Sequence, residues 1–174
     1  MKRLFLLLLC GCSFFGKGTK SQIYSLARVP GTPVATSGAP VGIDAIELPP
    51  GFDRKEIVVR QANNQLDVRG TQQWGAVFSQ EVLHTLASDL ASRLPAGMMI
   101  MPGAAKPAAM RNIDVAFEEL AAGPDARVVL EARWDRAHHE RIEVPIPSLD
   151  SASVATGTSQ ALAQLADRIA AGLR

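Results

Sequence analysis

Cysteine is scarce in this sequence, and its two copies, Cys10 and Cys12, both lie within the first twelve residues. They are too close together for an ordinary disulfide bond, and no other cysteine exists to pair with either, so a disulfide framework is excluded. Aromatic residues make up only 5% of the chain, which argues against a large stacking surface for sugars or bases. The formal charge is only +1, so no basic surface indicates a nucleic acid as partner.

Sequence signals of catalysis are missing as well. The chain contains no glycine-rich phosphate loop and no dinucleotide-binding fingerprint. Ser79, His84 and Asp89 have the residue types of a hydrolytic triad, but their spacing on one predicted helix scatters them around its axis. Asp89 and Arg93 are more simply a surface ion pair on that helix. We therefore predict that the protein is not an enzyme and needs no cofactor.

Two groups of potential metal ligands have simpler explanations. Met98, Met99 and Met101 offer the thioethers that copper(I) accepts, yet alternation along a strand sends Met99 to the opposite face from Met98. Methionine is also an ordinary core residue. The His138-His139-Glu140 sequence has no third ligand nearby, and neighbouring residues in a strand or turn point apart. No metal site is predicted.

The N-terminus is the most distinctive part of the chain. Lys2 and Arg3 form a short cationic start, and residues 4–10 form an apolar run that ends in small residues. This order is typical of a secretory signal peptide, which we assign to residues 1–11. The Leu9-Cys10-Gly11-Cys12 sequence resembles a bacterial lipobox, which predicts cleavage between its third and fourth residues, Gly11 and Cys12.

Cys12 is the predicted lipidation site, with a diacylglycerol on its sulfur and a further acyl chain on its freed amine. Two or three chains make membrane attachment effectively permanent. An uncleaved transmembrane anchor is the alternative, but it needs about 20 apolar residues, and Lys17 and Lys20 follow too soon. Ser13 stands where an inner-membrane retention signal usually places aspartate. By resemblance to enterobacterial sorting, this favours the periplasmic face of the outer membrane.

The rest of the chain divides into a leash and one domain. Residues 12–21 are predicted to form the lipidated N-terminus and a flexible leash, and residues 22–174 a single periplasmic domain. Loss of residues 1–11 removes two positive charges, so the formal charge falls from +1 to about −1.

Periodicity predicts strands, then a helix, then more strands and a closing helix. Alternation is clearest from Ile113 to Ile146, where three segments read as an antiparallel meander with one dry and one wet face. Shorter strands are predicted at 23–26, 41–48, 57–59, 66–68 and 98–101. A helix is predicted over 73–94, with Thr71 as its cap and Trp74 at its start, either capping the core or exposed to a partner. After a loop over 147–156, a narrow apolar stripe predicts a second helix to the end of the chain. We therefore expect an α/β fold, a single-domain sandwich with a mixed sheet and two long helices.

With these segments laid out, the chain resembles the auxiliary lipoprotein family of ABC-type lipid transport systems, the paraquat-inducible protein C (YmbA) type. The similarity covers nearly the whole mature chain. It rests on the order and spacing of several short motifs, namely Tyr24-Ser25-Leu26, the strand from Ile43 to Leu48 with Pro49, Phe52-Asp53-Arg54, Ile57-Val58, Arg60, Trp74, and Ala161-Leu162 to Leu173.

The resemblance implies a function that the residues alone do not. Such lipoproteins work with MCE-domain proteins, whose tubes or rings carry phospholipid between the inner and outer membranes. This chain would be the outer-membrane dock of such a tube, and itself a potential homo-oligomer. Exposed strand edges suit the addition of a partner strand, with Tyr24 and Trp74 as the predicted contact residues. The alternative is a structural lipoprotein of envelope assembly that binds an outer-membrane barrel or peptidoglycan.

Overall fold

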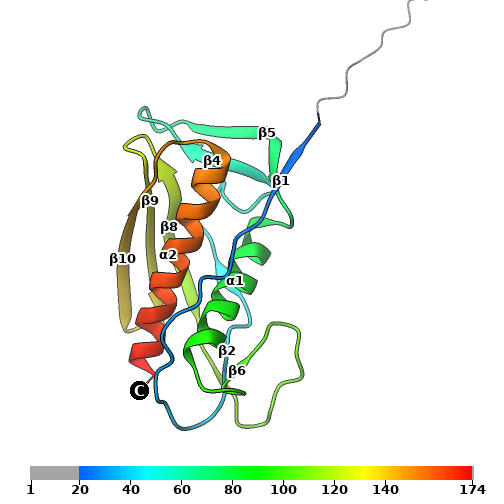
Figure 1. Ribbon diagram of the computed structural model, residues 1–174, viewed down its shortest axis with the longest axis vertical. Coiled ribbons are helices and arrows are strands. Elements are labelled where there is room, and N and C mark those ends of the chain that lie inside the picture. The colour runs from blue at the N-terminus through cyan, green and yellow to red at the C-terminus, as the bar shows by residue number, and fades with distance from the viewer. Residues whose placement is uncertain (1–19, 174) are drawn as a thin grey trace, which may run out of the picture.

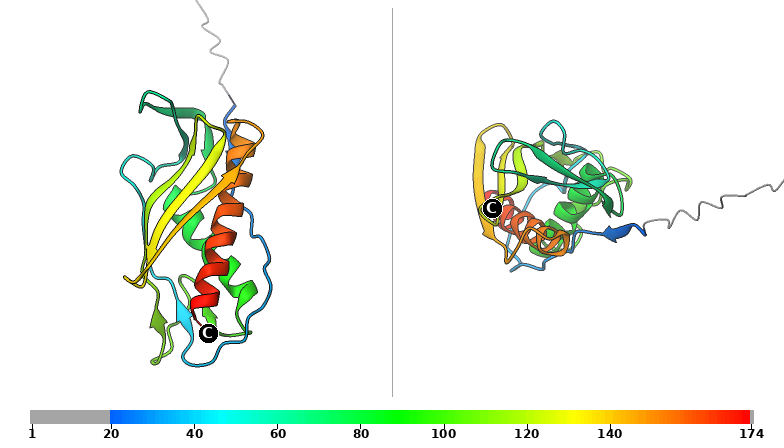
Figure 2. Two further views of the ribbon diagram at one scale, coloured as in Figure 1. Left: turned by 90° about the vertical axis from the view of Figure 1, so that its left-hand side faces the viewer. Right: turned by 90° about the horizontal axis from the view of Figure 1, so that it is seen from above.

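The computed structural model describes residues 20–173 of the chain. They form a mixed seven-stranded sheet, two long helices that cover one face of it, and a small three-stranded sheet at one end of the molecule (Figure 1, Figure 2). The predicted fold class, an α/β sandwich with an antiparallel meander and two helices, is confirmed. The predicted signal peptide and Cys12 fall outside the described residues, and the division of the chain stays a prediction.

The large sheet has the strand order β1-β5-β4-β8-β9-β10, and β3 also pairs with β8. Its strands are β1 (Gln22–Tyr24), β3 (Ile46–Glu47), β4 (Glu56–Arg60), β5 (Leu66–Trp74), β8 (Val115–Gly123), β9 (Arg127–Trp134) and β10 (His138–Pro145). The small sheet consists of parallel strands in the order β6 (Met99–Ile100), β2 (Val41–Gly42) and β7 (Arg111–Asn112).

The predicted meander is confirmed as β8, β9 and β10, which pair antiparallel in chain order. Every second side chain of β9 faces the helices and is buried, as are Ile142 and Val144 of β10. A bulge between Phe117 and Glu119 shifts the register of β8 against β9. The helix α2 (Ser151–Gly172) packs on this apolar face, and α1 (Phe78–Arg93) packs beside it on α2, β3 and β6, which encloses one main core.

The start of the first helix was predicted too early. Trp74 is the last residue of β5 rather than the opening of the helix, because Gln72–Trp74 pair in parallel with β1. Thr71 therefore caps nothing, and the N-cap position of α1 is Val77, which offers no side-chain hydrogen bond. The apolar face predicted for this helix is nevertheless buried from Phe78 to Leu94.

The loop predicted over 147–156 is wrong from Ser151 onward, because α2 begins there. Asp150 caps the helix, since its carboxylate accepts a hydrogen bond from the backbone nitrogen of Ser153 at 2.9 Å. The first turns of α2 contain small residues, and Gly157 is buried where the helix meets Val128 and Ile146 of the sheet layer. An apolar stripe is absent there because the close approach leaves no room for large side chains.

The strand predicted over 41–48 is also corrected. It divides into β2, which joins the small sheet, and β3, which joins the large one. Conversely, the short strand predicted over 66–68 extends to nine residues as β5. Of the helices in the described part of the chain, none is both long and apolar enough to cross a membrane.

Candidate interaction site

The sequence singled out four site residues, of which the structure describes two. Gly11 and Cys12 precede the described residues, so cleavage and lipidation stay predictions. Tyr24 and Trp74 are direct register partners across the parallel β1–β5 pair. The fold thus brings together two residues that lie fifty positions apart in the sequence.

Trp74 belongs to the core. Its side chain is 4% exposed and stacks on Phe78, with ring centroids 5.0 Å apart and an interplanar angle of 17°. The buried placement agrees with the core-capping alternative raised from the sequence. In this position the ring does not reach solvent, so of the two aromatic residues only Tyr24 is placed to contact a partner.

Tyr24 borders an open groove between the β1–β5 edge and the loop that leads into α2. Its hydroxyl donates a hydrogen bond to the side-chain oxygen of Gln22 at 3.0 Å. Arg69 of β5 spans the groove, because its guanidinium donates to Ser151 Oγ at 2.7 Å and to the carbonyl oxygen of Leu149. Ser151 in turn donates to the Gln72 side chain. These bonds tie β5 to the start of α2, and the groove is lined by neutral polar groups together with the charged side chains of Arg69 and Asp150.

The N-terminus of α2 at this groove is already occupied by its own cap. The Asp150 carboxylate accepts hydrogen bonds from the hydroxyls of Ser148 and Ser153 and from the Ser153 backbone nitrogen. These bonds, with that from Ser148 the strongest, hold the pKa of Asp150 far below its ordinary value. A negative charge thus sits where the helix would otherwise attract an anion.

The free edge of β5 is the feature best suited to binding another chain. β1 covers only Gln72–Trp74, and no strand in the described part of the chain pairs with residues 66–71 on the side away from β4. Leu66 and Val68 on this segment are 38% and 41% exposed. Val68 faces Val58 across the β4–β5 pair, and Val58 forms a small apolar cluster with Phe52 and Ala121 on the outer side of the sheet. Unpaired backbone and exposed apolar side chains therefore occur together.

The opposite edge of the sheet, β10, is protected. Along β10 the exposed side chains include His139, Arg141 and Glu143, and Pro145 ends the strand. Charges of both signs and a terminal proline are the usual means of keeping an edge from pairing with another chain. Of the two edges, β5 is the accessible one.

Three potential metal ligands do meet on the outer face of the meander. Side-chain atoms of Glu118, Glu131 and His139 lie within 4.8 Å of one another. Arg133 pairs with Glu118, and Arg141 donates to Glu131 at 2.7 Å. The bond from Arg141 is the main reason that the pKa of Glu131 is lowered. The carboxylates already have cationic partners, so this cluster is an ion-pair network.

The residues of a hydrolytic triad are not brought together. Ser79 lies at the exposed start of α1, where its backbone nitrogen bonds Asp53. His84 is exposed, whereas Asp89 is buried against the segment that precedes β2. The sequence predicted the strand of Leu66 and Val68 and its neighbour over 57–59, but it did not single out this segment as a site. The available signal was a strand with alternating apolar residues and only one predicted neighbour.

Comparisons with known proteins agree with this architecture. A family model described as an ABC-type transport auxiliary lipoprotein component matches residues 24–170. A crystal structure of an uncharacterized protein superposes with a TM-score of 0.74 at 15% identity, covering 90% of this chain and 100% of that one. Protein XCC0632 from Xanthomonas campestris, described as a DUF330 protein, superposes with a TM-score of 0.62 at 16% identity, covering 85% and 92%. No curated protein matches the sequence.

Proposed function

Because the chain belongs to the family of ABC-type transport auxiliary lipoprotein components, we propose that it is the outer-membrane dock of an intermembrane phospholipid transport system. Its partner would be the MCE-domain protein of that system, whose periplasmic tube it holds at the outer membrane. The observation that carries this proposal is the free, apolar edge of β5, which lies at the end of the domain where the chain enters from its N-terminus (Figure 1).

The anchor of this dock is the lipid on Cys12. Cleavage after Gly11 leaves Cys12 as the first residue, and residues 12–21 then connect the lipid to β1. A chain of this length spans at most about 35 Å when fully extended. The leash therefore keeps the β1–β5 end of the domain close to the periplasmic face of the membrane.

The dock binds its partner by strand addition. An extended segment placed beside residues 66–71 would satisfy the unpaired backbone groups of β5. Leu66 and Val68 would cover one side of the added strand, and Tyr24 would border its end. A second copy of the chain is the other partner of suitable form, which gives a homo-oligomeric ring.

The role is non-enzymatic. A structural component needs surfaces and edges rather than a reactive centre, and the candidate nucleophile, histidine and carboxylate considered above lie apart. The polar groups in the groove between the β1–β5 edge and the loop before α2 already form hydrogen bonds with one another.

Affinity purification of the tagged, lipidated protein from crosslinked envelopes tests the proposal. Val68→Lys places a charge on the exposed edge, and Gln160→Lys adds the same charge at an exposed position of α2 as the matched control. We expect the wild type and the control to retain an MCE-domain protein in stoichiometric amount, and Val68→Lys to lose most of it.

The outcomes separate the parts of the proposal. Equal capture by Val68→Lys would keep the transport role and refute the β5 site. A barrel or cell-wall protein in place of an MCE-domain protein would refute the transport role and support the envelope-assembly alternative. Normal outer-membrane fractionation of Cys12→Ser would refute the lipid anchor.

A further inference from the structure

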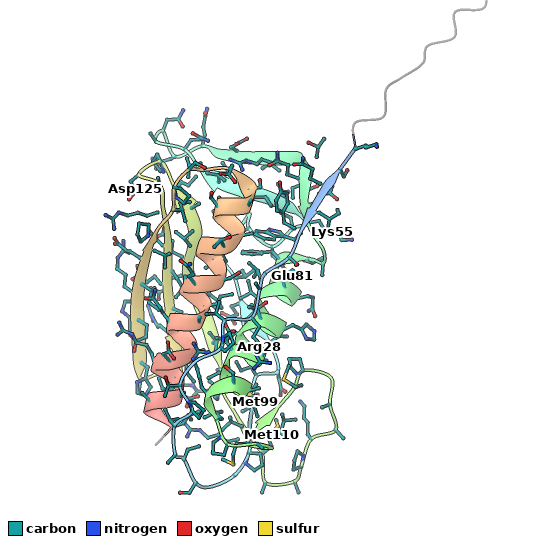
Figure 3. The ribbon with its side chains drawn as sticks, in the orientation of Figure 1. Arg28, Lys55, Glu81, Met99, Met110 and Asp125 are labelled. Atoms are coloured by element: carbon teal, nitrogen blue, oxygen red, sulfur yellow. The ribbon has the colours of Figure 1, made fainter. Side chains whose placement is uncertain are left out.

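The N-terminal strap, residues 22–36, runs from β1 along the outside of both helices toward the small sheet (Figure 1). Figure 3 labels Arg28 on the strap and Glu81 on the first part of α1, which the strap crosses. Beyond β1, side chains of the helices, rather than a neighbouring strand, supply most of the partners for its backbone.

Four strap amides donate to side-chain oxygens of the helices. The pairs are Leu26 to Glu81 Oε2 at 3.3 Å, Ala27 to Ser159 Oγ at 3.0 Å, Val29 to Asp89 Oδ1 at 2.8 Å, and Gly31 to Ser92 Oγ at 3.3 Å. Hydrogen bonds of this kind are separate points of attachment, each of which contributes only modestly to stability.

Arg93 closes the strap onto the helices. Its guanidinium is 2% exposed, bonds Asp167 Oδ1 of α2 at 2.6 Å and donates to the carbonyl oxygen of Val29 at 2.9 Å. Gly31 lies directly against it, and a Cβ at this position would come within 2.4 Å of the guanidinium carbon. The earlier expectation that Asp89 and Arg93 form a surface ion pair is wrong, because the strap and α2 bury both residues.

The strap contributes little to the core. Leu26 is its one buried side chain, while Val29 and Val34 are half-buried and most of the rest are exposed. A segment with few buried apolar side chains and point-like attachments belongs to the least stable part of a domain. Its release would remove β1 from the sheet, while the other strands and both helices keep their mutual contacts.

Asp89 makes attachment of the strap costly at neutral pH. The side chain is fully buried, and its Oδ2 atom has no hydrogen-bond partner within the described chain. Burial raises the pKa of Asp89 to about 6, and the negative charge of Asp167 adds to this rise. The hydrogen bond from Val29 and the positive charges of Arg93 and Arg28 act in the opposite direction. Since the attached state binds the proton more tightly than a solvated carboxyl does, attachment is strongest below the ordinary pKa of the carboxyl. It weakens as the pH rises to about 6 and levels off above that value.

We propose that the strap is a detachable length of tether, which peels from β5, α1 and α2 while the remainder of the domain stays folded. The tether function rests on the lipid anchor of the proposed function. Release moves the point of attachment from Gln22, at the β5 end, to Val41, at the small sheet. Residues 22–40 would then add about 60 Å of reach, which lets a docked domain follow a change in the distance between membrane and tube.

Hydrogen exchange of the full-length protein in detergent tests the release. We expect the amides of Val29, Gly31 and Val34 to exchange at least 100-fold faster than those of β9, whose opening requires global unfolding. Gly31→Ala pushes a methyl group into Arg93 and should raise strap exchange at least tenfold with β9 unchanged. Gly70→Ala is the matched control, because a Cβ there meets no atom within 4 Å.

The pH dependence of exchange distinguishes strap release that depends on Asp89 from simple fraying of the N-terminal segment. After correction for intrinsic exchange, strap opening should increase about tenfold from pH 5 to pH 8, if the released Asp89 returns to its ordinary pKa. Asp89→Asn keeps an oxygen acceptor for Val29 but removes the charge, so it should abolish this dependence. Strap amides that exchange at the β9 rate, or an unchanged pH dependence in Asp89→Asn, would overturn the proposal.

The added reach is measured on the lipidated protein in nanodiscs. Fluorescence energy transfer from the bilayer to a dye on Gln160→Cys should fall when Gly31→Ala is added, and unchanged transfer would refute the tether role. The exchange experiments need neither membrane nor partner. Their failure would leave the docking proposal standing, and failure to capture an MCE-domain protein would leave the strap result standing.

Discussion

The inner face of the β8–β9–β10 meander is covered by α2 (Figure 2), whereas the outer face carries solvent-exposed ion pairs. On the inner side, Leu130 and Ala132 are fully buried. On the outer side, their sequence neighbours Glu131 and Arg133 pair with residues of the adjacent strands. Successive residues of one strand thus enter two different environments.

This difference indicates where the stability of the domain resides. Burial of an aliphatic side chain contributes about 1.5–3 kcal/mol, whereas a solvent-exposed ion pair contributes little. The inner face therefore holds the fold together. The outer face is free to serve solubility and to disfavour unwanted pairing.

Removal of a large inner side chain should have the largest effect. Leu130→Ala leaves a cavity beneath the helices and should lower the free energy of unfolding by about 3 kcal/mol. Urea denaturation measures it, with Val129→Ala on the half-buried outer side as the control. Equal losses for the two variants would show that the two faces do not differ as described.

Addition of a methyl group to the closest helix–sheet contact should have a smaller effect. In Gly157→Ala the new Cβ would lie 2.4 Å from Ile146 Cγ2 and 2.9 Å from Val128 Cγ2. Overpacking costs about 1–3 kcal/mol, and the higher helix propensity of alanine returns about 1 kcal/mol. We expect a net loss of about 1 kcal/mol in the same denaturation experiment, and a gain would mean that the contact is loose.

Disruption of the outer network should have the smallest effect. Arg141 is half exposed and contacts both Glu131 and Glu143. Arg141→Ala should lower the Tm by about 2 °C or less, and 1 M salt should remove most of the difference. A larger, salt-independent loss would indicate that the outer face contributes to the core.

The same contrast explains what the sequence predicted correctly. Alternation from Val128 to Trp134 reports one buried face and one wet face, so the meander followed from the pattern. The stripe of Leu162, Leu165 and Ile169 likewise predicted the second half of α2. These are elements whose own side chains make the core.

The wrong predictions concern segments whose structure or burial depends on residues far away in the sequence. Trp74 looked like part of a helix because its strand pairing depends on β1, which lies far away in the sequence. The small residues before Gly157 looked like a loop because only the nearby sheet explains them. Asp89 and Arg93 were predicted on an exposed helix face, but in the structure the strap and α2 cover both residues. At the candidate site, the sequence indicated Tyr24 but not the open segment of β5. Whether a strand edge is unpaired depends on the arrangement of the other strands, which the residues of β5 do not reveal.

The parallel pairing of β1 with β5 has a mechanical consequence. A pull on the chain ahead of Gln22 acts along β1, whereas the hydrogen bonds to β5 lie across that direction. All the bonds between the two strands then bear the load together, in shear, instead of opening one after another as in a hairpin pulled apart at its ends. The three residue pairs between β1 and β5 can thus act as a latch. Tension on the anchor detaches β1 from the domain only when it exceeds the force that these pairs resist together.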